Sequence, residues 1–294
     1  MEKFIDKKLR QVFEDFQREA KRAGGLCECK GLTYEGGKLP KYSSPLVQQH
    51  YMLRFFPAYL AEYYLMYKNM LRQEFLAEIL KVLSIGCGCG IDFWGLYFAL
   101  KDSGKNPGKL INYTGVDIIA WQYQDNLGVE KVWFFNQDIT QWTKMDERDY
   151  NVIVLPKSIG EFSESAFEKV CNIFINTKFS EEKICGLCSL MDKGKESDAD
   201  RFLKIAKIMQ DRHGFTCLDK LDQYWTVTKE KGIRGLCSNF VYPDDILEKV
   251  KSSLNECPTF SKNEEPCKDN CGHLNRSPIL KTSFINYNML RFQR

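Results

Sequence analysis

Residues 86–90 read Gly-Cys-Gly-Cys-Gly, and their type and spacing indicate chemistry more directly than any other stretch of the chain. The residues before them, 82–85, suit a buried strand, and residues 91–100 read as an apolar helix. A strand that turns through glycines into a helix lets a ligand lie against backbone amides, because no side chain stands in the way. The motif is G-x-G-x-G, whereas a dinucleotide-binding turn reads G-x-G-x-x-G.

Two carboxylates follow the next two expected strands. Asp117 ends the strand predicted over residues 111–117, and an acid at the tip of the second strand of a βαβ unit can accept both hydroxyls of a ribose. Asp138 follows the strand predicted over residues 132–136. Each acid has a second interpretation: Asp117 could cap a helix that starts at Ile118, and Asp138 could cap the turn before Thr140.

A third group of candidates follows the fourth expected strand, residues 150–155. Catalytic or substrate-facing residues are expected here, and the side chains present are Lys157, Ser158 and Glu161. Glu161 could take a proton from a substrate, or it could cap the helix that begins near Ser163. Lys157 and Ser158 could simply end the strand. We expect the catalytic residue among these three.

The glycine pattern, the two acids and their order resemble motif I and the strand ends of the class I methyltransferases, which bind S-adenosylmethionine. The resemblance covers about residues 78–230. In that superfamily the acid after the third strand commonly meets the adenine amino group. The strand of motif I usually carries an acid two residues before the first glycine, where this chain has Ser84. The cofactor site that the resemblance implies comprises Ser84, Ile85, Gly86, Cys87, Gly88, Gly90, Asp117, Ile118, Asp138, Ile139 and Pro156.

The elements that position these residues predict an α/β fold. Strands that alternate with helices indicate a parallel sheet with its ligand at the carboxyl ends of the strands. The resemblance implies a Rossmann-like class I methyltransferase fold with a mostly parallel seven-stranded sheet, whose last strand, near residues 282–290, inserts antiparallel beside the sixth. We expect an N-terminal helical extension or lid over residues 1–77 and a methyltransferase domain over 78–294. Within that domain, residues 232–280 read as a helix and a cysteine-rich insertion.

Composition sets the class of protein. The 294 residues are 44% hydrophobic and 28% charged, as in a soluble globular protein. No apolar run is long enough to span a membrane, and the N-terminus does not read as a signal peptide, so we expect a cytoplasmic protein without a membrane partner. The net charge of +3 gives no strong attraction to nucleic acid. A basic tail of Arg276, Lys281, Arg291 and Arg294 could be a solvated face or a contact to RNA.

Twelve cysteines need an explanation, because disulfides are rare in the cytosol. Cys185 and Cys188 lie in the fifth expected strand, where residues three apart point to opposite faces, so packing is expected of them. Cys257, Cys267, Cys271 and His273 lie within seventeen residues and could supply the four ligands of a tetrahedral metal site, or the cysteines could be isolated thiols in a flexible loop. Zinc and an iron–sulfur cluster both fit this set, and Cys27, Cys29 or Cys237 could supply a ligand instead.

The same tail resembles the cysteine motif of methyltransferases associated with the small ribosomal subunit. The resemblance rests on the order Cys-Pro, Pro-Cys and Cys-x-His, followed by an arginine and a lysine, and on Tyr51, Arg54, Pro57 and Tyr59 before the glycine motif. It implies association with ribosomal RNA.

These observations predict a methyltransferase whose acceptor is unidentified, with RNA slightly favoured. Methyl transfer from a sulfonium proceeds by in-line displacement, so the enzyme mainly orients the acceptor and removes its proton. The alternative is a non-catalytic binding or assembly factor that uses the same fold to bind RNA or a ribonucleoprotein. Ser84 in place of an acid keeps that alternative open.

Overall fold

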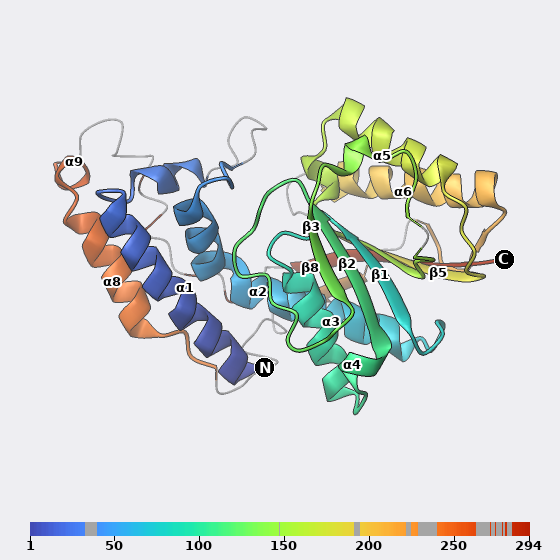
Figure 1. Ribbon diagram of the computed structural model, residues 1–294, viewed down its shortest axis with the longest axis horizontal. Helices are drawn as coiled ribbons and strands as arrows, with labels where there is room; N and C mark the ends of the chain where they lie inside the picture. The colour runs from blue at the N-terminus through green and yellow to red at the C-terminus, as the bar shows by residue number, and fades with distance from the viewer. Residues whose placement is uncertain are drawn as a thin grey trace. The chain divides into compact units, whose positions relative to one another are not determined.

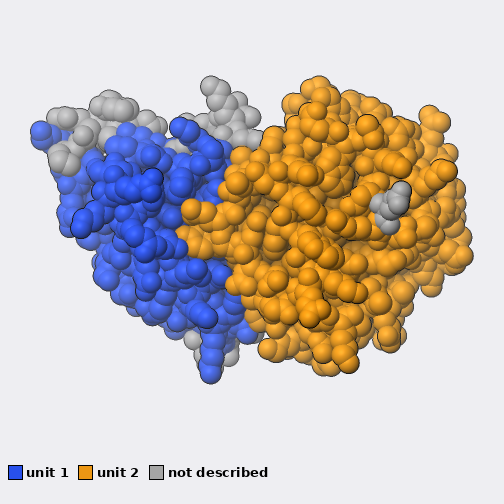
Figure 2. Space-filling model, viewed as in Figure 1, with its two compact units in different colours: residues 1–59, 231–282 blue, residues 60–230, 283–294 orange. Residues whose placement is uncertain are grey.

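The computed structural model describes residues 1–32, 40–146, 148–190, 195–221, 225–228, 240–262, 271, 274, 278, 280 and 284–294. The chain forms two compact units, which Figure 2 colours separately. Unit 1 comprises residues 1–59 and 231–282, and unit 2 comprises residues 60–230 and 283–294. The boundary falls inside one helix, α2 (Pro45–Arg72), whereas the sequence predicts a domain boundary after residue 77. The predicted division into domains 1–77 and 78–294 stays a prediction.

Unit 1 is helical in its described part. Its elements are α1 (Glu2–Arg22), η1 (Cys27–Gly31), the first part of α2, α8 (Asp244–Asn255) and α9 (Pro258–Ser261). Apolar side chains recur at helical spacing along α1 and are buried: Ile5, Leu9, Val12, Phe13 and Phe16. The Arg10 guanidinium lies 3.5 Å from the Asp245 carboxylate, and α1 and α8 run side by side in Figure 1. The helix predicted from Pro243 is confirmed, and it packs on the N-terminal helix.

Unit 2 is built on one sheet. Its described strands are β1 (Leu80–Ile85), β2 (Ile111–Asp117), β3 (Val132–Asn136), β4 (Val152–Pro156), β5 (Lys183–Ser189), β6 (Thr216–Cys217), β7 (Trp225–Thr228) and β8 (Phe284–Gln293). The order is β3-β2-β1-β4-β5-β8-β6, and β7 also pairs with β8. The first five strands are parallel, and β8 is antiparallel to β5 and β6. The mostly parallel sheet with an antiparallel last strand is therefore confirmed, and two short strands share its sixth position.

Helices cover both faces of this sheet (Figure 1). One face carries α5 (Glu164–Asn176) and α6 (Lys195–His213), and the other carries α3 (Ile91–Asp102) and α4 (Pro107–Leu110). Apolar residues of β1, β4, β5 and β8 form one buried core with α5 and α6, for example Leu83, Leu155, Cys188 and Leu290. Strands β1, β2, β4 and β5 are buried on both sides over most of their length, as a sheet between two layers of helices requires.

Pro57 is predicted to kink or restart its helix. The structure has one helix, α2, from Pro45 to Arg72, so the helix does not restart at Pro57, and the kink stays a prediction. Residues 118–131, which connect β2 to β3, contain no helix, although parallel neighbours are usually joined by one. The alternative interpretation of Asp117 as a helix cap is therefore wrong.

Candidate functional site

The glycine turn lies between β1 and α3. Gly86, Gly88 and Gly90 all have a left-handed backbone, with φ of +73°, +57° and +84°. A Cβ on Gly86 would lie 2.4 Å from the Cβ of Ser158, and one on Gly90 would lie 2.7 Å from the Phe134 ring. Both glycines are therefore required by packing inside the protein as well as by their backbone conformation.

Gly88 differs from its two neighbours. The first atoms that a Cβ there would meet belong to the Trp121 ring, at an ordinary contact distance of 3.8 Å. Cys87 beside it is buried, and burial raises the pKa of its thiol well above the ordinary value, so the thiol stays protonated at neutral pH. Gly88 is therefore the one glycine of this turn at which a Cβ would meet no described atom closer than 3.8 Å.

The Asp117 carboxylate points toward this turn. One oxygen accepts a hydrogen bond from the Gly88 amide at 2.9 Å, and the other accepts one from the Ile119 amide at 2.8 Å. Burial raises the pKa of Asp117, and these hydrogen bonds, with the Trp121 indole, act against that rise. The sequence predicted that Asp117 and the glycine turn share a site, and the structure brings them into direct contact.

The connection from β2 to β3 packs beside the glycine turn. The side-chain amide of Gln124 donates to the Gly88 carbonyl at 3.1 Å, and the Trp94 indole donates to the Asp125 carbonyl at 2.9 Å. These contacts hold the connection against the start of α3. Trp121 and Gln124 were not expected in the site, and the only sequence signal for them was an aromatic and polar run where a helix was expected.

The residues after β2 and β3 have different surroundings. Ile118 is 63% exposed, which is unusual for a large apolar side chain and leaves an apolar surface next to Asp117. Asp138 accepts a hydrogen bond from the Thr140 amide at 2.9 Å and so caps η3 (Ile139–Gln141). Burial raises the pKa of Asp138, but hydrogen bonds from Thr140 and Gln141 outweigh it and leave the pKa below its ordinary value. Ile139 is buried in the core. A role for Asp138 in adenine recognition stays a prediction.

A buried carboxylate that was not among the predicted site residues lies under the turn. Asp92, in the first turn of α3, is 1% exposed and accepts hydrogen bonds from the Tyr113 hydroxyl at 3.0 Å to each oxygen. The Tyr67 hydroxyl lies 3.5 Å from one of the same oxygens. The hydroxyls of Ser84 and Tyr113 lower the pKa of Asp92, but burial is the larger effect and raises it to about 6. Asp92 thus places a carboxyl group beside Ser84, the position at which related motifs carry their own acid.

The residues at the end of β4 are held by contacts within unit 2. Pro156 is the last residue of β4 and is buried. The Ser158 hydroxyl donates to the Ile85 carbonyl at 2.5 Å, which fastens this turn to the end of β1. The Lys157 ammonium lies 2.8 Å from the Glu62 carboxylate and donates to the Leu190 carbonyl at 2.9 Å. Glu62 is fully buried, so this is a buried ion pair. Catalytic roles for Lys157 and Ser158 stay predictions.

Glu161 is the third candidate in this turn. It is half-buried in η4 (Ile159–Glu161), and burial, followed by the negative charges of Asp117 and Asp198, raises its pKa to about 7. A carboxyl group with this pKa exists in both protonation states near neutral pH, which is what a general base requires. The helix predicted near Ser163 begins at Glu164, and the Ser163 side chain is its cap, so Glu161 is not needed for that purpose.

The predicted metal ligands lie mostly outside the described residues. Cys267 and His273 fall outside them, Cys257 is half-buried, and Cys271 is buried. Burial, followed by the charges of Glu28, Cys271 and Cys27, raises the pKa of Cys29 to about 12, so Cys29 lies near Cys271. Within the described part of the chain, no group of three or more His, Cys, Asp or Glu side chains is arranged to hold a metal ion. The metal site stays a prediction.

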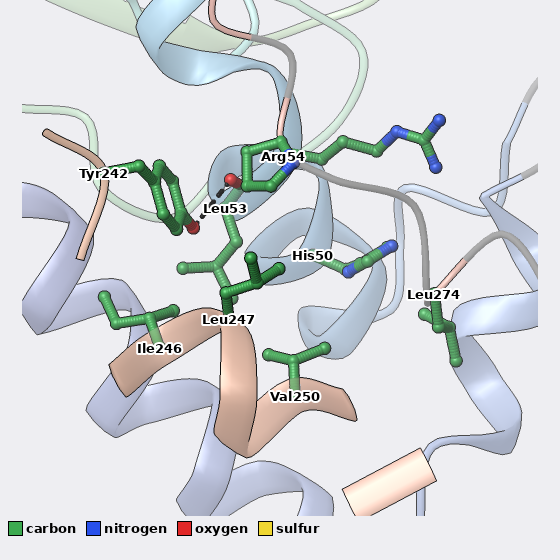
Figure 3. Close-up of a pocket in the computed structure, with 9 residues that line it drawn as sticks. His50, Leu53, Arg54, Tyr242, Ile246, Leu247, Val250 and Leu274 are labelled. Atoms are coloured by element: carbon green, nitrogen blue, oxygen red, sulfur yellow. Dashed lines mark hydrogen bonds between the residues drawn. The ribbon is translucent and has the colours of Figure 1, made fainter. Parts of the chain in front are cut away.

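A small cavity in unit 1 is lined by α2 and α8 (Figure 3). Its volume is about 20 Å³, and its walls are mainly apolar side chains such as Leu53, Ile246 and Val250. The Tyr242 hydroxyl donates to the Leu53 carbonyl at 3.0 Å across one end. A space of this size holds about one water molecule. It is therefore a packing feature and too small for a cofactor.

The basic tail is partly explained by contacts inside unit 2. Arg291 forms an ion pair with Asp219 at 2.7 Å, and Arg294 donates to the Phe179 carbonyl at 2.6 Å. Arg276 and Lys281 lie outside the described residues. Among the helices that are described, none is both long and apolar enough to cross a bilayer.

Comparisons with known proteins give no sequence relative. No protein-family model matches the chain, and a search of the curated proteins finds no match. Similar solved structures include the plantazolicin methyltransferase BpumL in complex with a triazolic desmethylPZN analog and SAH, with 14% identity, a TM-score of 0.43, and coverage of 98% of this chain and 100% of that chain. A SAM-dependent methyltransferase from Geobacter sulfurreducens with bound S-adenosyl-L-homocysteine has 14% identity, a TM-score of 0.41, and coverage of 79% of this chain and 91% of its own.

A third similar structure is the magnesium protoporphyrin IX methyltransferase from Synechocystis PCC 6803 with bound SAM. It has 16% identity and a TM-score of 0.35, and the match covers 66% of this chain and 81% of that chain. TM-scores below 0.5 do not establish a shared fold, so the assignment depends on features of this chain itself. The narrower resemblance to ribosome-associated methyltransferases stays a prediction.

Those features are the strand order, the antiparallel β8 between β5 and β6, the glycine turn after β1 and the acid at the end of β2. The glycine turn, the acid and an antiparallel last strand beside the sixth were expected from the resemblance to the class I methyltransferases, and each is found in unit 2. The fold of unit 2 is the Rossmann-like class I methyltransferase fold.

Proposed function

We propose that unit 2 binds S-adenosylmethionine outside the carboxyl ends of β1 and β2 and transfers its methyl group to a nitrogen or oxygen of an acceptor. The observation that carries this proposal is the Asp117 carboxylate, which is tied to the Gly88 amide at the mouth of the glycine turn. In open α/β sheets, ligands bind in the crevice at this edge.

Three residues would hold the cofactor. A carboxylate offers about four lone-pair directions, and the amides of Gly88 and Ile119 use two, so Asp117 can still accept the two hydroxyls of a ribose. Ile118 would offer its exposed side chain to the face of the adenine ring. Gly88 would let the nucleoside approach the main chain, once the Trp121 ring gives way. The residues present therefore fit the cofactor.

When bound, S-adenosylmethionine supplies a methyl group on a good leaving group. The protein then has to orient the acceptor and take its proton. Glu161 fits this role because its carboxyl group has a pKa of about 7 and its charge interacts with that of Asp117. Ser158 and Lys157 fit it less well, because the hydroxyl bonds to the Ile85 carbonyl and the ammonium bonds to Glu62 and the Leu190 carbonyl.

Transfer of a labelled methyl group tests this function even though the acceptor is unidentified. The protein would be incubated with methyl-tritiated S-adenosylmethionine and a cell extract, which is then separated into RNA, protein and small molecules. We expect label in one fraction with the wild-type protein, less with Glu161→Gln, and none with Asp117→Ala. Glu164→Gln is a matched control, because that carboxylate is exposed and lies in the first turn of α5. Equal label with and without active protein would refute the proposal.

The finer expectations stay separate proposals. RNA as the acceptor predicts label in the RNA fraction. Tight binding of the cofactor with no label in any fraction would favour the non-catalytic binding factor instead. A zinc ion or iron–sulfur cluster held by Cys257, Cys267, Cys271 and His273 predicts bound metal in elemental analysis of freshly purified protein, and a metal-free, folded preparation would refute it.

A further inference from the structure

A second polar cluster lies near the carboxyl ends of β4 and β5. Its members are Glu161, Asp198 and Asn288. The function proposed above uses Glu161 but gives no role to the other two. They come from η4, α6 and β8, three elements that are far apart in the sequence.

Asp198 is the acid nearest to Glu161 in this cluster. It is 3% exposed, in the first turn of α6, and a Cβ on Gly160 would lie 2.3 Å from one of its oxygens. The carboxylate therefore packs directly against the residue that precedes Glu161. Its negative charge raises the pKa of Glu161 on one side and of Cys188 on the other. A first-turn acid also interacts favourably with the helix dipole.

Asn288 lies next to Cys188 in the sheet. The two residues are directly opposite each other in the antiparallel pair of β5 and β8, so their side chains are on the same face. Asn288 is fully buried, and neither atom of its side-chain amide has a hydrogen-bond partner within the described part of the protein. A buried polar group without a partner costs on the order of 1–3 kcal/mol. A leucine of similar size would avoid that cost, so the amide requires another explanation.

We infer that Glu161, Asp198 and Asn288 form the subsite for the methyl acceptor, and that the acceptor is an amine. Two carboxylates favour a cationic ammonium group over a neutral or anionic one. The Asn288 amide can accept a hydrogen bond from the same nitrogen and donate one to a neighbouring acceptor atom. This inference rests on the proposed methyl transfer and names the class of its substrate.

The chemistry balances with the groups present. Glu161 takes a proton from the ammonium group and leaves the nitrogen with a lone pair. The nitrogen forms the new bond to the methyl carbon, the carbon–sulfur bond breaks, and its electron pair stays on the sulfur. Asp198 is a positioning residue, since it acts by orienting the ammonium and by raising the pKa of Glu161.

The test compares amines with alcohols of the same shape. Binding of a panel of primary amines (aliphatic, benzylic and amino-acid amides), each beside its matching alcohol, would be measured by calorimetry on protein saturated with S-adenosylmethionine. We expect at least one amine to bind, and its alcohol to bind on the order of tenfold more weakly. Asp198→Asn should remove this preference. A panel in which no amine binds more tightly than its alcohol would overturn the inference.

Asn288→Leu separates a ligand-binding amide from a packing residue. The substitution should raise the melting temperature, because it removes an unpaired buried amide, and should weaken amine binding by on the order of tenfold. A raised melting temperature with unchanged amine binding would overturn the inference, because water alone would then occupy the site. Asn151→Leu is the matched control: Asn151 is equally buried but bonds to the backbone of Lys81 and Ile79, so its replacement should lower the melting temperature. Saturation with the cofactor is measured first, so failure of cofactor binding is distinguished from failure of amine selection.

Discussion

Replacing Asp92 with asparagine should remove a defined part of the pH dependence of the protein's stability. Asp92 is buried under the glycine turn, and its pKa is raised from 3.8 to about 6, mainly by burial. A carboxyl group whose pKa is higher in the folded state favours folding at low pH, and that contribution is lost as the pH rises through the folded-state value. The interval from 3.8 to about 6 corresponds to about 3 kcal/mol.

The amide of Asp92→Asn does not titrate, so the variant lacks this loss. The free energy of unfolding of the variant minus that of the wild type should therefore rise by about 3 kcal/mol between about pH 4 and about pH 8. Urea unfolding of both proteins across this pH range measures the difference in free energy of unfolding. The contributions of the other titrating groups are the same in both proteins and cancel in this difference.

Asp102→Asn is the matched control, because Asp102 lies in the same helix. Hydrogen bonds from the Tyr64 hydroxyl and the Lys68 ammonium lower the pKa of Asp102, so that difference should run in the opposite direction. A pH-independent difference for Asp92→Asn would refute the reasoning, since it would mean that the carboxylate is solvated in the folded protein.

Three further predictions concern the site and its support. The value of kcat/KM for the acceptor should rise with pH and level off above about 7, because Glu161 acts as its carboxylate, and Glu161→Gln should lower it by about 10²–10⁴-fold in a pH–rate profile. Gly90→Ala should lower the free energy of unfolding, measured in urea, by about 1–3 kcal/mol more than Gly104→Ala does. Both glycines have positive φ, but a Cβ on Gly90 would meet an aromatic ring, whereas a Cβ on Gly104 would have nothing within 4 Å. Glu62→Ala should lower the free energy of unfolding by about 3–5 kcal/mol, because it removes the carboxylate partner of the mostly buried Lys157 ammonium. By contrast, Glu181→Ala should cost at most about 1 kcal/mol, because its ion pair is partly exposed.

Each of these has a result that would contradict it. A flat pH–rate profile would remove Glu161 as the base. If Gly90→Ala and Gly104→Ala lower the free energy of unfolding equally, backbone strain alone determines the loss, and the aromatic ring beside Gly90 moves away easily. If Glu62→Ala and Glu181→Ala lower the free energy of unfolding equally, the ion pair between Glu62 and Lys157 is open to water.

The sequence was sufficient for the features that depend on local patterns. Apolar runs located five parallel strands, and the alternation in residues 282–290 located the strand that becomes β8. Three glycines in five residues predicted a left-handed turn, because few other residues adopt that backbone. Asp117 was predicted for the site because parallel strands end at a common edge.

The remaining site residues depend on contacts between distant parts of the chain. Glu62 meets Lys157 only because α2 lies against the end of β4, and Asn288 faces the α6 side only because of the register between β5 and β8. No local pattern encodes either pairing. Asp92 did have a local signal, since an acid in an apolar helix directly after the glycines must find polar partners.

The central claim is that Asp117 and the glycine turn bind S-adenosylmethionine, and titration calorimetry tests it most directly. The wild-type protein should bind the cofactor, and Asp117→Ala should weaken that binding by on the order of 10–100-fold, as expected for the loss of hydrogen bonds to a charged group. Asp102→Ala, in the helix that follows the turn, should leave the affinity unchanged. The account would be contradicted by a wild-type protein that releases no heat of binding at about 1 mM cofactor. Equal affinities for the wild type and Asp117→Ala would contradict it as well.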